Sequence, residues 1–121
     1  ELPVVQREAG AGSQAAFERA RGGGRRSQVV AGPRVRGHAE AAWRAATDGL
    51  VAVTIEPAAL ANGLAFAPLE EHRSQLWTVE EHVDNALLHA FLEEVTGERV
   101  RRRLEAIGGY DLSDSGVEVP T

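Results

Sequence analysis

The earlier part of the chain alternates short extended apolar runs with stretches in which apolar residues recur at helical spacing. Glycine, proline or an Asn-Gly pair separates most of these segments, and such residues commonly end strands and helices. This pattern predicts extended segments at residues 3–6, 28–31, 50–55, 64–68 and 74–79. It predicts helices at residues 13–21 and 38–47, and a short helix opened by Glu56-Pro57.

Strands that alternate with helices predict an α/β fold, in which helices flank a mostly parallel sheet to give three layers. The segment 50–55 is almost wholly apolar, which is typical of a strand covered on both faces. Trp43 and Trp77 are expected to lie in the core rather than to act as stacking platforms.

The pattern changes near residue 80, where helical spacing takes over. Apolar residues from Val83 to Val95 predict an amphipathic helix at about 84–95, and a second helix is predicted at 98–107. We therefore predict a ligand-binding α/β lobe at residues 1–79. Residues 80–121 are predicted to be a helical segment that belongs to another lobe or to a dimer interface. The apolar stripe of these helices needs a cover, so we expect either a further segment upstream or a homodimer through the 84–107 helices.

Composition narrows the class of protein. Hydrophobic residues make up 43% of the 121 residues and charged residues 26%, as in ordinary soluble domains. The net charge of −5 argues against direct contact with nucleic acid, and the lack of cysteine excludes disulfides and thiolate metal sites. No apolar run is long enough to span a membrane and no signal peptide is seen. We expect a cytoplasmic location, or an extracytoplasmic one if a leader before Glu1 has been removed.

The stretch that favours a function is the glycine turn Gly10-Ala11-Gly12 between the first strand and the first helix. Glycines allow close approach of a ligand to the backbone, and a helix start presents unpaired N–H groups with a partial positive charge. The pattern therefore predicts an anion site. Ser13 is expected either to cap the helix or to offer its hydroxyl to a ligand oxygen.

Two further positions are predicted at the same edge of the sheet. His38 follows Gly37 at the start of the second long helix, and Thr54 lies near the end of the buried strand. Ligands of open parallel sheets bind beyond the carboxyl ends of the strands, so His38 and Thr54 are expected to face the crevice that contains Ser13.

Other chemistry is disfavoured. Glu70-Glu71-His72 and Glu80-Glu81-His82 combine carboxylates with an imidazole, but neither has the spacing of a metal-binding helix, and solvated turns are expected. The chain also lacks a Gly-x-Ser-x-Gly elbow, a complete dinucleotide fingerprint and a P-loop lysine. We predict that the chain is not an enzyme, and expect no cofactor and no metal.

Four stretches resemble the later part of a type II periplasmic-binding-protein-like domain, the substrate-binding module related to molybdate- and tungstate-binding proteins. Residues 5–13 are similar to the family's Val-Asn-Arg-Gln-x-Gly-x-Gly-Thr, and His38 with its alanine-rich helix resembles the second ligand-side turn. Residues 63–71 with Leu76 are similar to the Gly-Leu-x-Phe-x-Pro-Leu run, and residues 108–111 to the closing Gly-Tyr-Asp.

The resemblance implies two lobes that close on a small oxyanion, with molybdate or tungstate as the leading ligand, in a transcriptional regulator or a transport system. A fused helix-turn-helix is the expected partner in a regulator. Ser13 and the N–H groups from Gly12 to Gln14 are then ligand contacts. The predicted ligand-binding set is Gly10, Gly12, Ser13, Gln14, His38 and Thr54.

The chain departs from the family pattern at several positions. Ala9 and Gln14 stand where the family often has basic residues, and Glu8 stands where it has an amide. Gly49-Leu50-Val51-Ala52 replaces the family's Ala-Asp-Ala-Gly run. The alternative function is therefore a degenerate dimerisation or interaction module of a regulator, which keeps the fold and no longer binds a ligand.

Overall fold

The computed structural model of the chain describes residues 2–22 and 29–120 and comprises two compact units. The N-terminal unit ends at Glu71, and the C-terminal unit begins at His72. The functional roles predicted for residues 1–79, a ligand-binding lobe, and for residues 80–121, a segment of another lobe or of a dimer interface, stay predictions.

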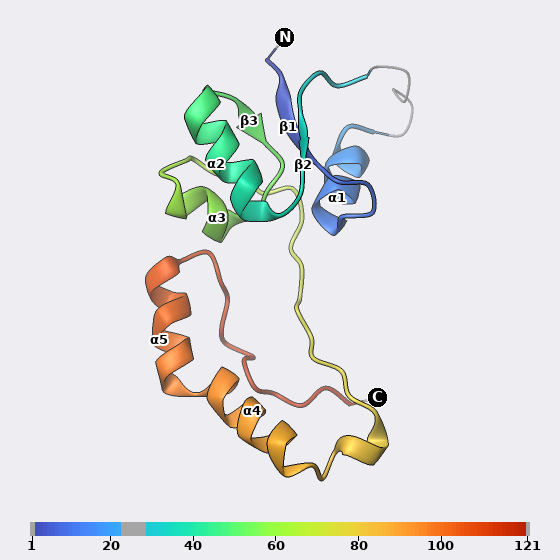
Figure 1. Ribbon diagram of the computed structural model, residues 1–121, viewed down its shortest axis with the longest axis vertical. Helices are drawn as coiled ribbons and strands as arrows, with labels where there is room; N and C mark the ends of the chain where they lie inside the picture. The colour runs from blue at the N-terminus through green and yellow to red at the C-terminus, as the bar shows by residue number, and fades with distance from the viewer. Residues whose placement is uncertain (1, 23–28, 121) are drawn as a thin grey trace. The chain divides into compact units, whose positions relative to one another are not determined.

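The N-terminal unit is built on a parallel sheet of three short strands, β1 (Val4–Arg7), β2 (Arg34–Val35) and β3 (Val51–Ala52). Their order is β2-β1-β3, so the first strand of the chain lies in the middle (Figure 1). In this register Gln6 lies opposite Arg34, and Val5 lies opposite Ala52.

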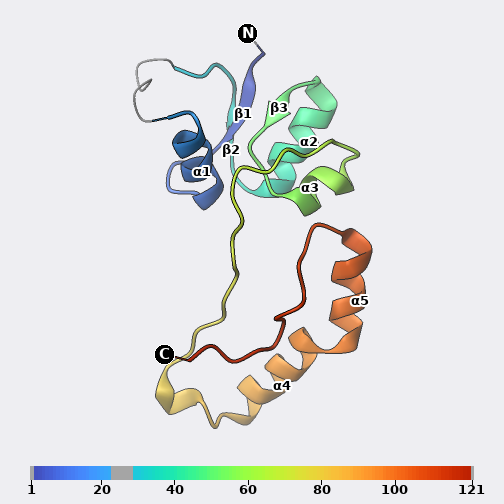
Figure 2. The same ribbon diagram turned by 180° about the vertical axis from the view of Figure 1, so that it is seen from behind.

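Three helices flank this sheet: α1 (Gly12–Ala20), α2 (His38–Asp48) and α3 (Glu56–Ala61). Figures 1 and 2 show α1 on one side of the sheet and α2 with α3 on the other. Helix α1 contacts β1, and α2 contacts β1, β3 and α3. The predicted α/β class, with a parallel sheet between layers of helices, is confirmed.

The core is small and is made largely of valine and alanine. Val5, Val35 and Ala41 form its buried cluster, against which Leu50 and Ala52 pack. Alanines on α2 allow this helix to approach the sheet closely. The placement of the two tryptophans in the core was wrong, because Trp43 on α2 is 57% exposed and Trp77 is 69% exposed.

The second strand lies later in the sequence than predicted. Gln28 falls outside the described residues, and Val29 is exposed. Pairing with β1 begins at Ala31, whose carbonyl accepts a hydrogen bond from the Val4 N–H at 2.8 Å, and continues through the Pro33 carbonyl to Val35. Pro33 directly precedes β2 and still contributes its carbonyl, which accepts a hydrogen bond from the Gln6 N–H at 2.9 Å.

The other extended segments contain less strand than predicted. Only Val51–Ala52 of the segment 50–55 is strand, and Val51 is half exposed because β3 forms an edge of the sheet. Segments 64–68 and 74–79 contain no strand. Most of their side chains are exposed, and an extended segment without a partner leaves its backbone groups to water.

The C-terminal unit holds a short 3₁₀ helix, η1 (Glu80–His82), and two longer helices, α4 (Ala86–Thr96) and α5 (Glu98–Ile107). Both long helices were predicted. Asn85 caps α4, because its side-chain oxygen accepts hydrogen bonds from the N–H groups of Leu87 and Leu88. Helices α4 and α5 contact each other, but Leu87 is 81% exposed and Phe91 is half exposed. The homodimer through these helices stays a prediction.

No helix within the described residues combines the length and the apolar character that a membrane span requires.

Candidate functional site

Polar side chains gather in the N-terminal unit where the strands end and the helices begin. Arg7 is the last residue of β1, Ser13 lies in the first turn of α1, and His38 is the first residue of α2. Because the sheet is parallel, its carboxyl ends share one edge, and this is where open α/β sheets bind their ligands.

Arg7 is the centre of this group, and only 7% of its side chain is exposed. Its guanidinium Nη1 lies 2.6 Å from His38 Nδ1 and 3.4 Å from Ser13 Oγ. Its other edge faces Glu8, with Nε donating to Oε2 at 2.9 Å and Nη2 donating to Oε1 at 3.0 Å. We call the four side chains of Arg7, Glu8, Ser13 and His38 the arginine cluster.

Glu8 neutralises the buried guanidinium through this paired contact. The hydrogen bonds from Arg7 are the largest of the causes that lower the pKa of the Glu8 carboxyl from 4.5 to about 2. Its side chain is 39% exposed, so the carboxylate lies between the buried cation and solvent. Glu8 is therefore a permanent anion at neutral pH and accepts hydrogen bonds without donating any.

His38 is neutral in this arrangement. Burial lowers the pKa of the imidazole, and the nearby charge of Arg7 lowers it further, while Glu8 acts in the opposite direction. A guanidinium can only donate, so Nδ1 accepts from Arg7 and the ring proton is on Nε2. The Thr54 hydroxyl donates to the backbone carbonyl of His38 at 2.9 Å and links the start of α2 to the segment that follows β3. Thr54 thus acts on the cluster by positioning His38.

Gln14, in the first turn of α1, is buried, with only 2% of the residue exposed. Its Oε1 accepts from the Arg7 backbone N–H at 2.9 Å, and its Nε2 donates to Gln6 Oε1 at 3.1 Å and to Glu18 Oε1 at 3.2 Å. The side chain therefore fixes α1 against β1, and the predicted ligand contact of Gln14 is limited to its backbone N–H, which has no partner within the helix.

The glycine turn lies next to this cluster. Gly10 has a φ of +87°, which glycine adopts without strain, and Gly12 opens α1. Ala11 is the N-cap residue of α1 and no side chain caps the helix, so the capping role considered for Ser13 is not observed. The Ser13 hydroxyl accepts from Arg7 instead and keeps its own proton available to a ligand.

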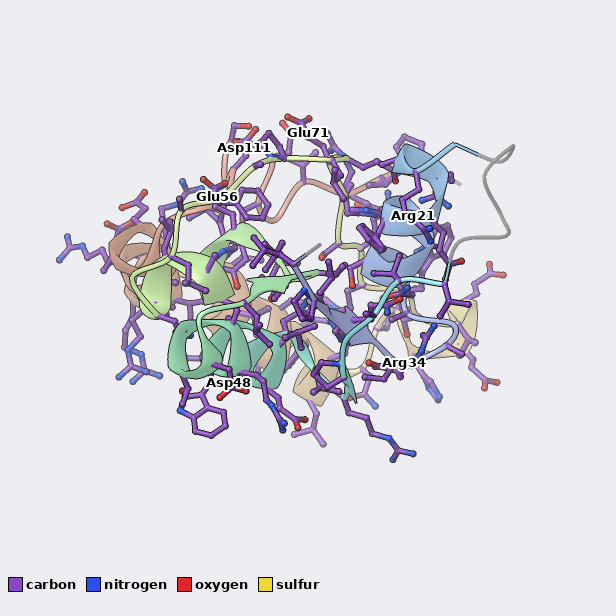
Figure 3. The ribbon with its side chains drawn as sticks, turned by 90° about the horizontal axis from the view of Figure 1, so that it is seen from above. Arg21, Arg34, Asp48, Glu56, Glu71 and Asp111 are labelled. Carbon is purple, nitrogen blue, oxygen red and sulfur yellow. The ribbon has the colours of Figure 1, made fainter. Side chains whose placement is uncertain are left out.

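An open depression adjoins the cluster on the side of β2. It is lined by Glu8, Ala9, Arg34, Val35, Arg36 and Glu40. Arg34, labelled in Figure 3, also donates to the backbone carbonyl of Arg7 at 3.0 Å. None of the six predicted ligand-binding residues lines this depression, and Glu8 is the residue that belongs both to it and to the arginine cluster.

The sequence interpretation placed Ser13 and His38 at the carboxyl edge of the sheet, where the structure also has them, and it left out Arg7. Contact of any of these residues with a ligand stays a prediction. A signal was present, since Arg7 directly precedes the glycine turn at the end of a predicted strand. No group of three or more histidine, cysteine or acidic side chains in the described parts of the chain is placed to hold a metal ion.

Comparison with known families supports a binding role. Residues 1–96 match the model of the PBP superfamily domain. No curated protein and no solved structure matched the chain. The match includes β1, the glycine turn, α1, α2 and α4, and the family is one of generally non-catalytic substrate-binding domains. The chain therefore belongs to the PBP superfamily domain family and is a PBP-like substrate-binding domain.

Proposed function

We propose that the chain binds a small oxyanion, with molybdate or tungstate as the leading ligand, at the carboxyl edge of the N-terminal sheet. The observation that carries this proposal is the buried guanidinium of Arg7, which meets Ser13 and His38 beside the start of α1. Glu8 neutralises this guanidinium in the structure, and the support for an anion comes from the Ser13 hydroxyl and His38 Nε2–H, each of which keeps a proton to donate.

Three kinds of donor are available to the anion in this arrangement. The backbone N–H groups of Gly12, Ser13 and Gln14 lie in the first turn of α1 and have no partner within the helix. The Ser13 hydroxyl supplies a second donor and His38 Nε2–H a third. Tetrahedral oxyanions are bound well by such neutral donors, because each oxygen accepts several hydrogen bonds.

The role of the domain in the cell belongs to the same proposal. Sensing of the anion in the cytoplasm, with the signal passed to a fused helix-turn-helix, is the form we favour, and a transport role is the other. The depression beside the cluster is lined by two arginines, Arg34 and Arg36, and by two carboxylates, Glu8 and Glu40, so its formal charges balance.

Calorimetric titration tests the proposal. Sodium molybdate, tungstate and sulfate are titrated into the chain, and heat with a defined stoichiometry is expected for at least one of them. Ser13→Ala is expected to weaken that binding by about 0.5–1.5 kcal/mol, the contribution of one hydroxyl hydrogen bond. Ser74→Ala, at an exposed position of the C-terminal unit, is the matched control and should leave the affinity unchanged.

The absence of binding heat at millimolar concentrations of all three anions contradicts the proposal. It favours the alternative function, a dimerisation or interaction module that has lost its ligand.

A further inference from the structure

The contact between Arg7 and Glu8 has the geometry with which an arginine usually binds an anionic ligand. Two N–H groups on one edge of the guanidinium, Nε and Nη2, donate to the two oxygens of one carboxylate at 2.9 and 3.0 Å. Bidentate contacts of this kind are the main way in which arginine recognises carboxylates and phosphates. In this structure the two oxygens come from the chain itself.

The two partners differ in their freedom to move. The Arg7 side chain is 7% exposed and is further held by His38 and Ser13. The Glu8 side chain is 39% exposed, and besides Arg7 its carboxylate has only backbone N–H groups, those of Glu8 and Gly37, among the hydrogen-bond causes that lower its pKa. Glu8 also lines the open depression, and Arg7 does not. Rotation of the Glu8 side chain toward water would uncover the N–H edge of a guanidinium that stays in place.

We propose that Glu8 is a built-in competitor for the anion, which occupies the bidentate edge of Arg7 until a ligand with two suitably spaced oxygens replaces it. The inference rests on the proposed function and adds the ligand class, namely an anion that offers two oxygens to one guanidinium. A carboxylate and a tetrahedral oxyanion both meet this requirement, and the exchange sets the affinity of the site.

Simple repulsion between Glu8 and an anion is the explanation that has to be separated from direct competition. Glu40 allows this separation, because it lines the same depression and carries the same charge. Its Oε2 accepts from the Arg36 backbone N–H at 3.3 Å rather than from Arg7. Removal of either charge relieves repulsion, but only the removal of Glu8 frees the edge of Arg7.

The test compares Glu8→Gln with Glu40→Gln in titrations with sulfate, molybdate and acetate. Glu8→Gln is expected to tighten binding of at least one anion by about tenfold or more, since one charge-assisted bidentate contact becomes available. Glu40→Gln is expected to change affinity by no more than about twofold to threefold, as for an exposed charge. Acetate distinguishes a carboxylate ligand from a tetrahedral one. A gain in affinity for acetate alone assigns a carboxylate ligand, and a gain in affinity for sulfate or molybdate assigns a tetrahedral oxyanion.

Equal changes in affinity in the two variants overturn the inference, and so does weaker binding by Glu8→Gln. In either case, anion binding by the unsubstituted chain leaves the proposed function standing. If none of the three proteins binds any of the anions, both the inference and the proposed function are overturned. If Glu8→Gln does not fold, the carboxyl carbon resonance of Glu8 is followed by NMR in the unsubstituted chain during a sulfate titration. A shift that saturates with sulfate supports the exchange, and an unmoved resonance while sulfate binds overturns it.

Discussion

His38 Nδ1 lies 2.6 Å from Arg7 Nη1, which makes the imidazole a hydrogen-bond acceptor for a buried cation. A protonated His38 could not accept this bond and would place a second positive charge beside the guanidinium. The arrangement at the edge of the sheet therefore depends on a neutral histidine, and a dependence of stability on pH follows.

We expect the free energy of unfolding to fall as the pH decreases below about 6.5, the ordinary pKa of histidine. The pKa of folded His38 is lowered, so the unfolded chain takes up the proton first and gains free energy from it. Glu8 adds a separate loss at lower pH, between 4.5 and about 2, because its pKa is also lowered in the folded state.

Urea unfolding followed at several pH values measures the effect. His38→Asn is the informative variant, because an asparagine oxygen can accept from Arg7 and does not titrate. Its free energy of unfolding is expected to fall less than that of the unsubstituted chain when the pH drops below about 6.5. An identical decline in both proteins would show that His38 does not carry the effect.

Gln14 is expected to matter for stability even though it was predicted as a ligand contact. Gln14→Ala leaves the Arg7 backbone N–H without its buried acceptor, so we expect a loss of about 1–3 kcal/mol in the free energy of unfolding. Glu18→Ala is the matched control on the same helix. It removes only the exposed partner of the Gln14 amide and should cost less than about 0.5 kcal/mol. Equal losses in the two variants would contradict the buried role.

The arginine cluster illustrates what the sequence could and could not predict. The glycine turn, the helix after it and the helix at His38 follow from local signals, and the structure contains all three. The burial of Arg7 does not follow from local signals. It depends on His38, 31 residues further along the chain, and on the Gln14 amide that fixes α1 against β1. An arginine at a strand end ordinarily indicates a solvated position.

The strand errors have a related cause. Apolar runs such as 64–68 have strand propensity, but a strand forms only where a partner supplies hydrogen bonds. Strand β2 forms because residues 31–35 run alongside β1 and supply its hydrogen-bond acceptors. Gly32 allows this close approach because it has no Cβ. A Cβ on Gly32 would lie 2.0 Å from the Val4 carbonyl oxygen, a contact that no side chain tolerates.

Gly32→Ala is therefore expected to be strongly destabilising. Its φ of +136° is unfavourable for alanine, and the clash is with backbone rather than with a flexible side chain. We expect a loss of at least about 2 kcal/mol in the free energy of unfolding. Gly12→Ala is the control, since a Cβ there meets no atom within 4 Å and alanine favours helix α1. Its effect should lie between none and a gain of about 1 kcal/mol. Comparable losses in both variants would contradict the close packing at Gly32.

At the same edge of the sheet, substitution of Thr54 can distinguish a role in positioning His38 from direct contact with a ligand. Its hydroxyl proton is donated to the His38 carbonyl, so an anion oxygen has no proton to accept from it. Thr54→Val keeps the shape of the side chain and removes this bond. We expect a loss of about 0.5–1.5 kcal/mol in the free energy of unfolding, and we expect Thr54→Ser to restore most of it.

The loss caused by Thr54→Val should be nearly the same with and without saturating sulfate, because the hydroxyl supports His38 in both states. Urea unfolding of the three proteins under both conditions measures this. A loss that grows by more than about 1 kcal/mol when sulfate is present would instead assign Thr54 a direct contact with the bound anion. The double comparison thus tests a predicted ligand residue without depending on which anion the domain binds best.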